Sequence, residues 1–319
     1  MRDAVAEERD VQAGAAWTLI RGDACEELAA LEPESAGFSI FSPPFSALYT
    51  YSDSVRDIGN CRGDDEFAEH FGYVAAGLFR VLQTGRLCSV HLMDLPTSIQ
   101  HNGHIGLRDF PGLVTRSMCA AGFIYHSKVI IWKNPVTAMQ RTKALGLLYK
   151  QVQKDSSMAR QGIPDEVRTF RKPGENKARL KRTPNEMPLA SDKCPDGWDK
   201  RHNWQNYASP VWMDINASDT LQRTSAREDN DERHICPLQL EVIRRCVQLW
   251  SNPGDVVLSP FAGIGSEGHE AIRAGRRFVG VELKDSYYRQ AVKNLTRAES
   301  EMDAKTLFSD PVAFAEASQ

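Results

Sequence analysis

The chain has 319 residues, of which 41% are hydrophobic and 25% are charged, a composition typical of a globular protein that buries a sizeable core. It contains no apolar run of about 18 residues and opens on the polar stretch MRDAVAEERD, so we expect neither a membrane span nor a signal peptide. The formal net charge of −3 alone argues against a nucleic-acid partner, but the charge is unevenly distributed.

Strand-like and helix-like patterns alternate through the first 133 residues. Short apolar runs that end at polar residues or glycine predict buried strands, and apolar residues at intervals of three or four predict amphipathic helices. In chain order these are a strand at 15–24, a helix at 25–33, a strand at 37–41, a helix at 65–85 that ends at Gly85, a strand at 86–93, a helix at 113–122, and one strand, or two with a kink, at 123–133. This order predicts a parallel, doubly wound α/β sheet.

The pattern is lost between residues 134 and 233, where polar residues, Pro, Gly and isolated aromatic residues follow no period. From Arg141 to Arg201 the chain has 15 Lys and Arg against 8 Asp and Glu, which leaves −10 for the rest. Such a segment is typical of a region that binds a polyanion, and a solvated, partly disordered insert is the alternative. A basic cluster within it comprises Lys177, Arg179, Lys181 and Arg182.

Alternating elements return after this segment. They are a helix at 234–250, a strand at 254–261, a helix at 266–275, a strand at 276–283 and a helix at 285–299. The sequence therefore predicts an α/β domain in two halves, residues 1–133 and 234–319, separated by an insert at 134–233.

The stretch VVLSPFAGIGSEG at 256–268 is the richest motif, because a strand runs into a glycine-containing loop and a helix begins just after it. Glycines let a ligand approach the backbone, and the N-terminus of the following helix favours polar or anionic groups. The next strand ends in Glu282, 17 residues after Gly265, where an acid in a nucleotide-binding α/β fold commonly takes ribose hydroxyls. The alternative is a tight turn beside a solvated glutamate.

A second motif, Ser-Pro-Pro-Phe, follows the strand at 37–41. With SPFAGIGSEG later in the chain and a basic insert between the two, it resembles the β-class DNA amino-methyltransferases, which use S-adenosylmethionine and have this circularly permuted motif order. The resemblance covers residues 15–133 and 234–296. It implies a Rossmann-like methyltransferase fold in which residues 134–233 form a target-recognition region.

The resemblance assigns the chemistry to Ser42, Pro43, Pro44 and Phe45, which match the family motif (Asp/Asn/Ser)-Pro-Pro-(Tyr/Phe/Trp). An exocyclic amine is conjugated with its base and is a poor nucleophile, so the site must hold a flipped-out base with the amine facing the methyl-sulfonium. The Ser42 hydroxyl and the Pro43 carbonyl can accept hydrogen bonds from the amine, while Phe45 stacks on the base. Rigid prolines keep these groups in place, so catalysis rests on positioning.

The resemblance also implies a binding site for S-adenosylmethionine. Asp23, at the end of the first strand, matches the acid that contacts the adenine amino group, and Glu282 matches the acid that binds the ribose. Phe261, Gly263 and Gly265 match the loop around the methionine moiety.

The chain departs from the family pattern at one cofactor position. Ser259 stands before Pro-Phe, where the family usually has the Asp that faces the ammonium group of the cofactor. Either Ser259 accepts a weaker hydrogen bond or another carboxylate takes this role.

Pro237 and Leu238 lie in HICPLQL, which resembles the segment that closes over the cofactor.

Other chemistries fit the sequence less well. Carbon-5 cytosine methyltransferases need a nucleophilic Cys after Pro, whereas this chain has only Cys-Pro, at Cys194 and Cys236. In CPDGWDK the second acid and the lysine lie too close to the Pro-Asp pair for a nuclease site. HNGH at 101–104 has no further ligands at zinc spacing, so no metal is expected. Seven cysteines without a C-x-x-C pair predict reduced thiols in a cytoplasmic protein.

The sequence therefore predicts a site-specific methyltransferase that acts on double-stranded DNA. The Ser-Pro-Pro-aromatic motif favours N4 of cytosine, whereas the longer stretch SPPFSALYTYSDSVRDIGN resembles phage-type orphan enzymes, several of which modify adenine. We favour N6 of adenine and keep N4 of cytosine as the alternative. A catalytically inactive DNA-binding regulator is the alternative from a different class. The resemblance to the β class also implies a homodimer.

Overall fold

The computed structural model describes residues 9–45, 58–61, 63–142, 146–181, 205–221 and 238–309. Its α-helices are α1 (Ala24–Ala30), α2 (Asp64–Val81), α3 (Ile99–Asn102), α4 (Phe110–Ala120), α5 (Pro135–Thr142), α6 (Tyr149–Lys154), α8 (Leu240–Trp250), α9 (Ser266–Arg273) and α10 (Asp285–Ser309). In the described part of the chain, no helix combines the length and the apolar character that a membrane crossing requires.

The described strands form a nine-stranded central sheet and a separate hairpin. The order across the central sheet is β1 (Asp10–Ala13), β2 (Trp17–Arg21), β11 (Arg277–Glu282), β10 (Val256–Ser259), β3 (Ala36–Phe41), β4 (Leu82–Leu92), β8 (Asp165–Arg171), β7 (Ile124–Ile131) and β9 (Val211–Trp212). Strands β2, β11, β10, β3 and β4 are parallel neighbours, while β8 runs antiparallel between β4 and β7. The hairpin consists of β5 (Leu95–Thr97) and β6 (Gly106–Arg108).

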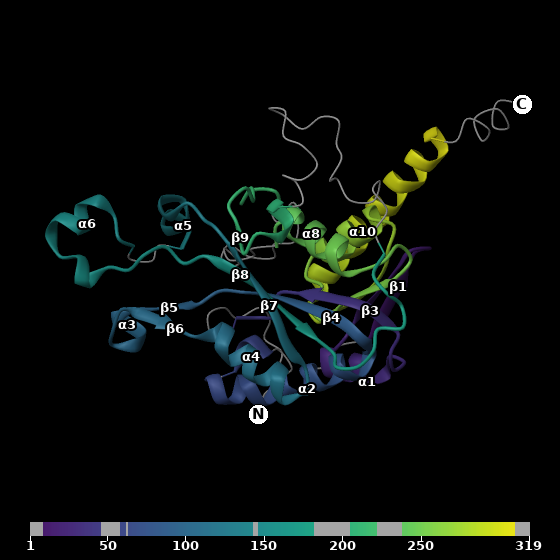
Figure 1. The fold of residues 1–319 in the computed structure, drawn as a ribbon, viewed down its shortest axis with the longest axis horizontal. Coiled ribbons are helices and arrows are strands. Elements are labelled where there is room, and N and C mark those ends of the chain that lie inside the picture. Colours follow the sequence, from purple (N-terminus) through teal and green to yellow (C-terminus); the bar gives the residue numbers. More distant parts are fainter. Residues whose placement is uncertain are drawn as a thin grey trace, which may run out of the picture.

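Helices cover both faces of the central sheet, with α1, α2 and α4 on one side and α8 and α10 on the other (Figure 1). Each face has its own hydrophobic cluster, because successive side chains of a strand point to opposite faces. Phe38 and Ile40 of β3 pack with α8, α9 and α10, whereas Phe41 packs with α1, α2 and α4. The doubly wound, mostly parallel sheet predicted from the sequence is therefore confirmed.

The helix predicted to end at Gly85 ends earlier. Helix α2 stops at Val81 and β4 begins at Leu82, so Gly85 lies inside a strand, with a φ of 76°. Leu78 and Leu82 are four residues apart, which is helical spacing. The apolar pattern therefore predicted a helix that extends beyond Val81, where α2 ends. A short apolar run does not by itself distinguish the end of a buried helix from the start of a buried strand.

The segment without a predicted pattern contributes two strands, β8 and the short β9, to the central sheet. β8 pairs with both β4 and β7, and its Phe170 is fully buried. Strand β8 was missed because Asp165, Glu166 and Thr169 are also buried, which removes the usual alternation of apolar and polar residues. Only the rest of residues 134–233 is therefore available for a separate recognition region, and this division of the chain stays a prediction.

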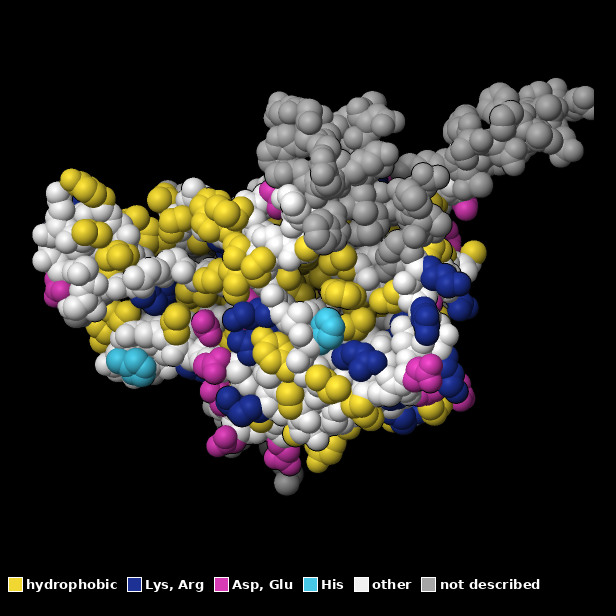
Figure 2. Space-filling view, viewed as in Figure 1, with side chains coloured by type: hydrophobic (Ala, Val, Ile, Leu, Met, Phe, Trp, Pro, Cys, Tyr) yellow, Lys and Arg dark blue, Asp and Glu magenta, His cyan; other side chains and the backbone are white. Residues whose placement is uncertain are grey.

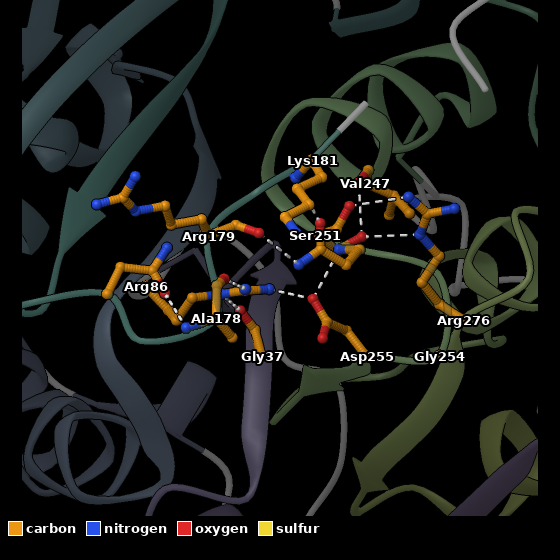
Figure 3. Close-up of polar contacts among 12 residues, drawn as sticks. Gly37, Arg86, Ala178, Arg179, Lys181, Val247, Ser251, Gly254, Asp255 and Arg276 are labelled. Atoms are coloured by element: carbon orange, nitrogen blue, oxygen red, sulfur yellow. Dashed lines mark hydrogen bonds and ion pairs between the residues drawn. The ribbon is translucent and has the colours of Figure 1, made fainter. Parts of the chain in front are cut away.

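A buried arginine, Arg86, holds the stretch of chain that follows β8 at the amino-terminal edge of the sheet, as Figure 3 shows. Arg86 is fully buried, and its Nε donates to the carbonyl of Gly37 at 2.7 Å, while Nη1 donates to the carbonyl of Ala178 at 2.8 Å. Its Nη2 pairs with the carboxylate of Asp255, just before β10. The segment 177–181 is thereby held where β3 and β10 begin.

The described part of the predicted basic cluster consequently lies at the amino-terminal edge of the sheet, whereas Ser42 lies at the carboxyl-terminal edge. The side chain of Asn252 donates to the carbonyl of Arg179 at 3.2 Å and accepts from the backbone of Lys181 at 3.0 Å. Arg182 lies outside the described residues. Strand β3 separates the two edges, and its six residues span about 20 Å. DNA binding by this cluster stays a prediction, and its position does not favour contact with DNA near Ser42.

Candidate active site

The side chains predicted to bind or react lie along one edge of the sheet. Asp23, Ser42, Ser259 and Glu282 end or follow β2, β3, β10 and β11, which are neighbouring parallel strands. Between β10 and β3 the winding of the chain reverses, because β11 lies on one side and β4 on the other. In open α/β sheets, ligands bind in the crevice at the carboxyl ends of the strands at this point.

The Ser-Pro-Pro-Phe motif begins where β3 leaves the core. Pro43 is buried and Phe45 is half-buried, with its ring edge-on to Phe110 of α4 at 5.6 Å between centroids. Phe41, the residue before the motif, contacts Phe261 of the glycine loop at 5.7 Å between centroids. The structure thus brings together the two motifs that are more than 200 residues apart in the sequence.

Glu282 organises the glycine loop. Its Oε2 accepts the backbone N–H of Gly263 at 2.7 Å, and its Oε1 accepts the N–H of Lys284 at 2.9 Å. Gly263 and Gly265 have φ values of 53° and 84°, a region that favours glycine. A Cβ at Gly263 would meet no described atom within 4 Å, so the backbone there is open to a ligand.

Asp23 has a structural role that the sequence did not reveal. It is the N-cap of α1, and its Oδ1 accepts from the backbone N–H groups of Cys25 at 2.8 Å and Glu26 at 3.1 Å. The contact with the cofactor adenine stays a prediction, because capping alone accounts for an Asp at this position. Leu238 is buried, and Pro237 lies outside the described residues.

The buried side-chain oxygens near this edge that have no hydrogen-bond partner among the described residues include Gln239 Oε1, Ser259 Oγ and Ser266 Oγ. Gln239 precedes α8 and Ser266 begins α9, and helices that connect parallel strands start at the carboxyl edge of the sheet. Buried polar atoms are nearly always paired in native proteins. These oxygens therefore fit a ligand with several polar groups, such as the methionine end of S-adenosylmethionine.

Glu267, in the first turn of α9, is a further buried carboxyl group at this edge. Burial raises the pKa of Glu267 to about 8, and the nearby carboxylate of Glu282 adds to the increase. No Lys, Arg or His in the described ranges forms an ion pair with Glu267. A cationic group of a ligand would favour its charged form, so Glu267 is a candidate for the carboxylate that replaces the Asp missing at Ser259.

Replacing Glu267 with Gln is expected to remove a pH dependence of stability. The carboxyl group has an ordinary pKa of 4.5 and a folded pKa of about 8, so its favourable contribution is complete below about pH 4.5 and is lost as the pH rises through about 8. Urea unfolding without cofactor should show the parent losing stability between about pH 5 and about pH 8 relative to Glu267→Gln. Glu301→Gln, on the exposed part of α10, is the control. Parallel curves for Glu267→Gln and the parent would contradict the expectation.

A chain of polar groups behind Ser42 was not predicted from the sequence. The Ser42 hydroxyl lies 3.2 Å from Nδ1 of His91, near the end of β4. Nε2 of His91 lies 3.2 Å from Oδ2 of Asp165, the first residue of β8, although its N–H is not aligned for a linear hydrogen bond. Lys133 pairs with the other carboxylate oxygen, Oδ1. Burial raises the pKa of Asp165, but its interactions with His91 and Lys133 outweigh burial and hold the pKa below its ordinary value.

Comparison with known proteins decides the family. The sequence model of the DNA methylase family N6_N4_Mtase matches residues 38–293. The chain belongs to this family. It is a DNA methyltransferase of the amino-methylating class, with S-adenosylmethionine as its methyl donor.

One sequence relative and two solved structures are similar to this DNA methylase over most of its length. The DNA adenine methyltransferase YhdJ of Escherichia coli is 24% identical over 282 residues, which are 88% of this chain and 83% of YhdJ. TTHA0409 of Thermus thermophilus, crystallised with S-adenosyl-L-methionine, is 23% identical, with a TM-score of 0.60 over 88% of this chain and 94% of its own. The cytosine-N4-specific PvuII DNA methyltransferase is 15% identical, with a TM-score of 0.59 over 90% of this chain and 93% of its own.

Replacing Glu282 with Ala is expected to weaken S-adenosylmethionine binding by about 1.5–3 kcal/mol, the contribution of a charged hydrogen bond. The physical reason is the loss of the predicted ribose contact, together with release of the loop N–H groups of Gly263 and Lys284. Isothermal titration calorimetry measures the affinity directly. Glu282→Gln, which keeps one acceptor oxygen, should bind with intermediate affinity. Unchanged affinity in both variants would remove Glu282 from the cofactor site.

Proposed function

We propose that this DNA methylase transfers a methyl group from S-adenosylmethionine to the N6 amine of a flipped-out adenine in double-stranded DNA. The observation that carries the proposal is the position of Ser42–Phe45 at the end of β3, next to the loop that contains Phe261. The similarity to YhdJ, a DNA adenine methyltransferase, over most of both chains supports adenine as the target.

In this proposal the motif activates the amine by holding it. The Ser42 oxygen and the Pro43 carbonyl accept its two hydrogens, which places the nitrogen lone pair toward the methyl group of the cofactor. Phe45 provides a face for the extruded base, and its contact with Phe110 fixes the ring. Nitrogen attacks the methyl carbon, the bond from carbon to sulfur breaks, and the amine then loses one proton. The products are the methylated base and S-adenosylhomocysteine.

Methylation of cytosine at N4 is the alternative target. A serine in the first position of the motif favours it, and the PvuII enzyme, which is cytosine-N4-specific, shares the fold. A catalytically inactive DNA-binding regulator is the alternative from another class. It would bind S-adenosylmethionine and DNA without producing a methylated base.

Target recognition is proposed for the part of residues 134–233 that lies outside the sheet. This side of the molecule carries exposed apolar side chains around α5, α6 and β9, where apolar groups gather in Figure 2. They include Val136, Tyr149, Val211 and Met213, with Trp132 just before α5. Exposed apolar patches commonly mark interaction sites. This surface supports contact with DNA or with a second copy of the chain, and the homodimer is part of the proposal.

The target base is tested by incubating the purified protein with unmethylated DNA and S-adenosylmethionine, followed by digestion and mass spectrometry of the nucleosides. N6-methyldeoxyadenosine is expected, and it should be absent with Ser42→Ala. N4-methyldeoxycytidine would establish the alternative target. No methylated nucleoside, together with normal binding of DNA and cofactor, would establish the inactive regulator. The mass in solution tests the homodimer.

A further inference from the structure

A serine in the first position of the motif poses a problem that aspartate does not. A carboxylate oxygen can only accept hydrogen bonds, so it always meets the amino hydrogens of the target base as an acceptor. A hydroxyl group can also donate. If Ser42 donated its hydrogen to the amine nitrogen, it would occupy the lone pair that must attack the methyl group. The site therefore needs a group that takes the hydroxyl hydrogen of Ser42.

His91 is placed to take this hydrogen. Its Nδ1 lies 3.2 Å from the Ser42 hydroxyl, and its backbone carbonyl lies 3.5 Å away and forms a longer hydrogen bond. The side chain of His91 is buried in β4, the strand next to β3. When the hydroxyl donates to Nδ1, both lone pairs of the serine oxygen remain free to accept from the amine.

Asp165 and Lys133 determine which nitrogen of His91 carries the proton. The carboxylate of Asp165 lies 3.2 Å from Nε2 and is 3% exposed, so it favours a proton on Nε2. Nδ1 is then left as the acceptor for Ser42. The ammonium group of Lys133 pairs with the same carboxylate and keeps it charged in its buried position.

We propose that His91, oriented by Asp165, is a positioning residue that fixes the Ser42 hydroxyl as an acceptor for the target amine. The inference rests on the role of Ser42 in the proposed function. It assigns a purpose to a buried ionic cluster that lies at the carboxyl edge of β4 and β7, directly behind the motif. It also explains how a serine performs the task of the aspartate found in other members of the family.

The first test is a double-mutant cycle between His91→Leu and Ser42→Asp. In the parent, His91→Leu is expected to lower kcat by about tenfold or more, because a hydrogen bond that holds the reacting geometry is lost. The Michaelis constants for DNA and S-adenosylmethionine should change little. In the Ser42→Asp background, the same substitution is expected to lower kcat less than about threefold, because a carboxylate needs no partner to act as an acceptor. Equal losses in the two backgrounds would overturn the proposal.

The second test uses substitutions that replace one ring nitrogen at a time. His91→Asn places an amide oxygen near the position of Nδ1, whereas His91→Gln places its amide near the position of Nε2. We expect His91→Asn to retain about tenfold more activity than His91→Gln, with similar unfolding midpoints. Equal activities would overturn the proposal even if His91→Leu did not fold. His126→Leu, on β7 and outside the site, is the matched control.

A third variant addresses Asp165. Asp165→Asn can donate to Nε2 and so moves the ring proton to Nδ1, which turns the acceptor for Ser42 into a donor. In the serine proteases the corresponding change lowers kcat by about 10⁴ with little change in geometry. Here we expect a reduction of about 10²-fold or more, with calorimetry showing normal cofactor binding. A parental kcat in Asp165→Asn would overturn the assignment of Asp165.

Failure of the inference and failure of the proposed function give different results. If the parent protein yields no N6-methyldeoxyadenosine, the proposed function fails. If it does, and Ser42→Ala retains parental kcat, the role of Ser42 and the positioning network are rejected while the function stands. If Ser42→Ala is inactive while the His91 and Asp165 variants keep parental kcat, the function stands and only the positioning network is rejected.

Discussion

Replacement of Phe45 by alanine is expected to lower the rate of methyl transfer by about tenfold or more while S-adenosylmethionine affinity stays unchanged. The reason is the loss of stacking between the ring and the extruded base, which contributes about 1–3 kcal/mol. The effect should fall on DNA-dependent turnover, because the cofactor contacts predicted here come from other loops. Single-turnover kinetics with saturating cofactor, and calorimetry without DNA, measure the two quantities separately.

Phe79→Ala is the matched control for Phe45→Ala. Phe79 is also a half-buried phenylalanine on the same face of the sheet, and it packs edge-on against Phe123 at 5.1 Å between centroids. It belongs to α2, away from the motif, so its truncation should reduce stability without changing the turnover of folded enzyme. Phe45→Tyr, which keeps the ring, should remain active. Equal turnover by Phe45→Ala and the parent would reject the stacking role.

Replacement of Arg86 by leucine is expected to lower the free energy of unfolding by about 3–5 kcal/mol, the usual cost of removing one partner from a buried ion pair. Arg86 is fully buried, with 0% solvent exposure, and it donates to two backbone carbonyls and pairs with the Asp255 carboxylate. Its loss removes the donors to the carbonyls of Gly37 and Ala178, leaves the partly buried Asp255 carboxylate without its cationic partner, and releases the segment 177–181 from the amino edge. Urea unfolding measures the change.

Arg273→Leu is the control for Arg86→Leu. Arg273 pairs with Glu301 at 3.1 Å on the surface, where both side chains are more than a third exposed. An exposed pair of this kind contributes about 0–1 kcal/mol, so the control should unfold close to the parent. Because Arg86 lies at the edge opposite to Ser42, the folded fraction of Arg86→Leu should retain parental turnover. A similar midpoint for both arginine variants would show that the buried network contributes little.

Much of the fold could be predicted because the signals are local. The helical spacing of Phe67, Phe71, Val74 and Leu78 on α2, and the apolar runs of β3 and β10, arise from periods of a few residues. The predicted helix end at Gly85 was wrong and strand β8 was not predicted, and both errors have the same physical reason. Burial of polar groups such as Asp165 and continuation of an apolar face across a boundary depend on neighbours that are distant in the sequence.

The motifs proposed to carry the reaction and to bind the cofactor could be identified in the sequence, because each is a contiguous stretch with a restricted backbone. Ser42–Phe45 contains two prolines, and the loop after Ser259 contains Gly263 and Gly265, both with positive φ. The second role of Asp23 as a helix cap, and the use of both Glu282 oxygens by loop N–H groups, became visible only in the structure.

The sequence by itself determined the alternation of strands and helices in the two α/β halves, the two motifs and therefore the family of this protein. Tertiary structure alone decided which distant residues meet. His91 and Asp165 reach Ser42 because β4 lies between β3 and β8, an order across the sheet that no local pattern encodes. The basic cluster at 177–181 lies opposite to Ser42 because the strands between them run parallel and Arg86 holds that segment at the amino edge. The local sequence contains the spacing of apolar residues that defines each helix and strand, whereas the packing of the sheet determines the contacts between them.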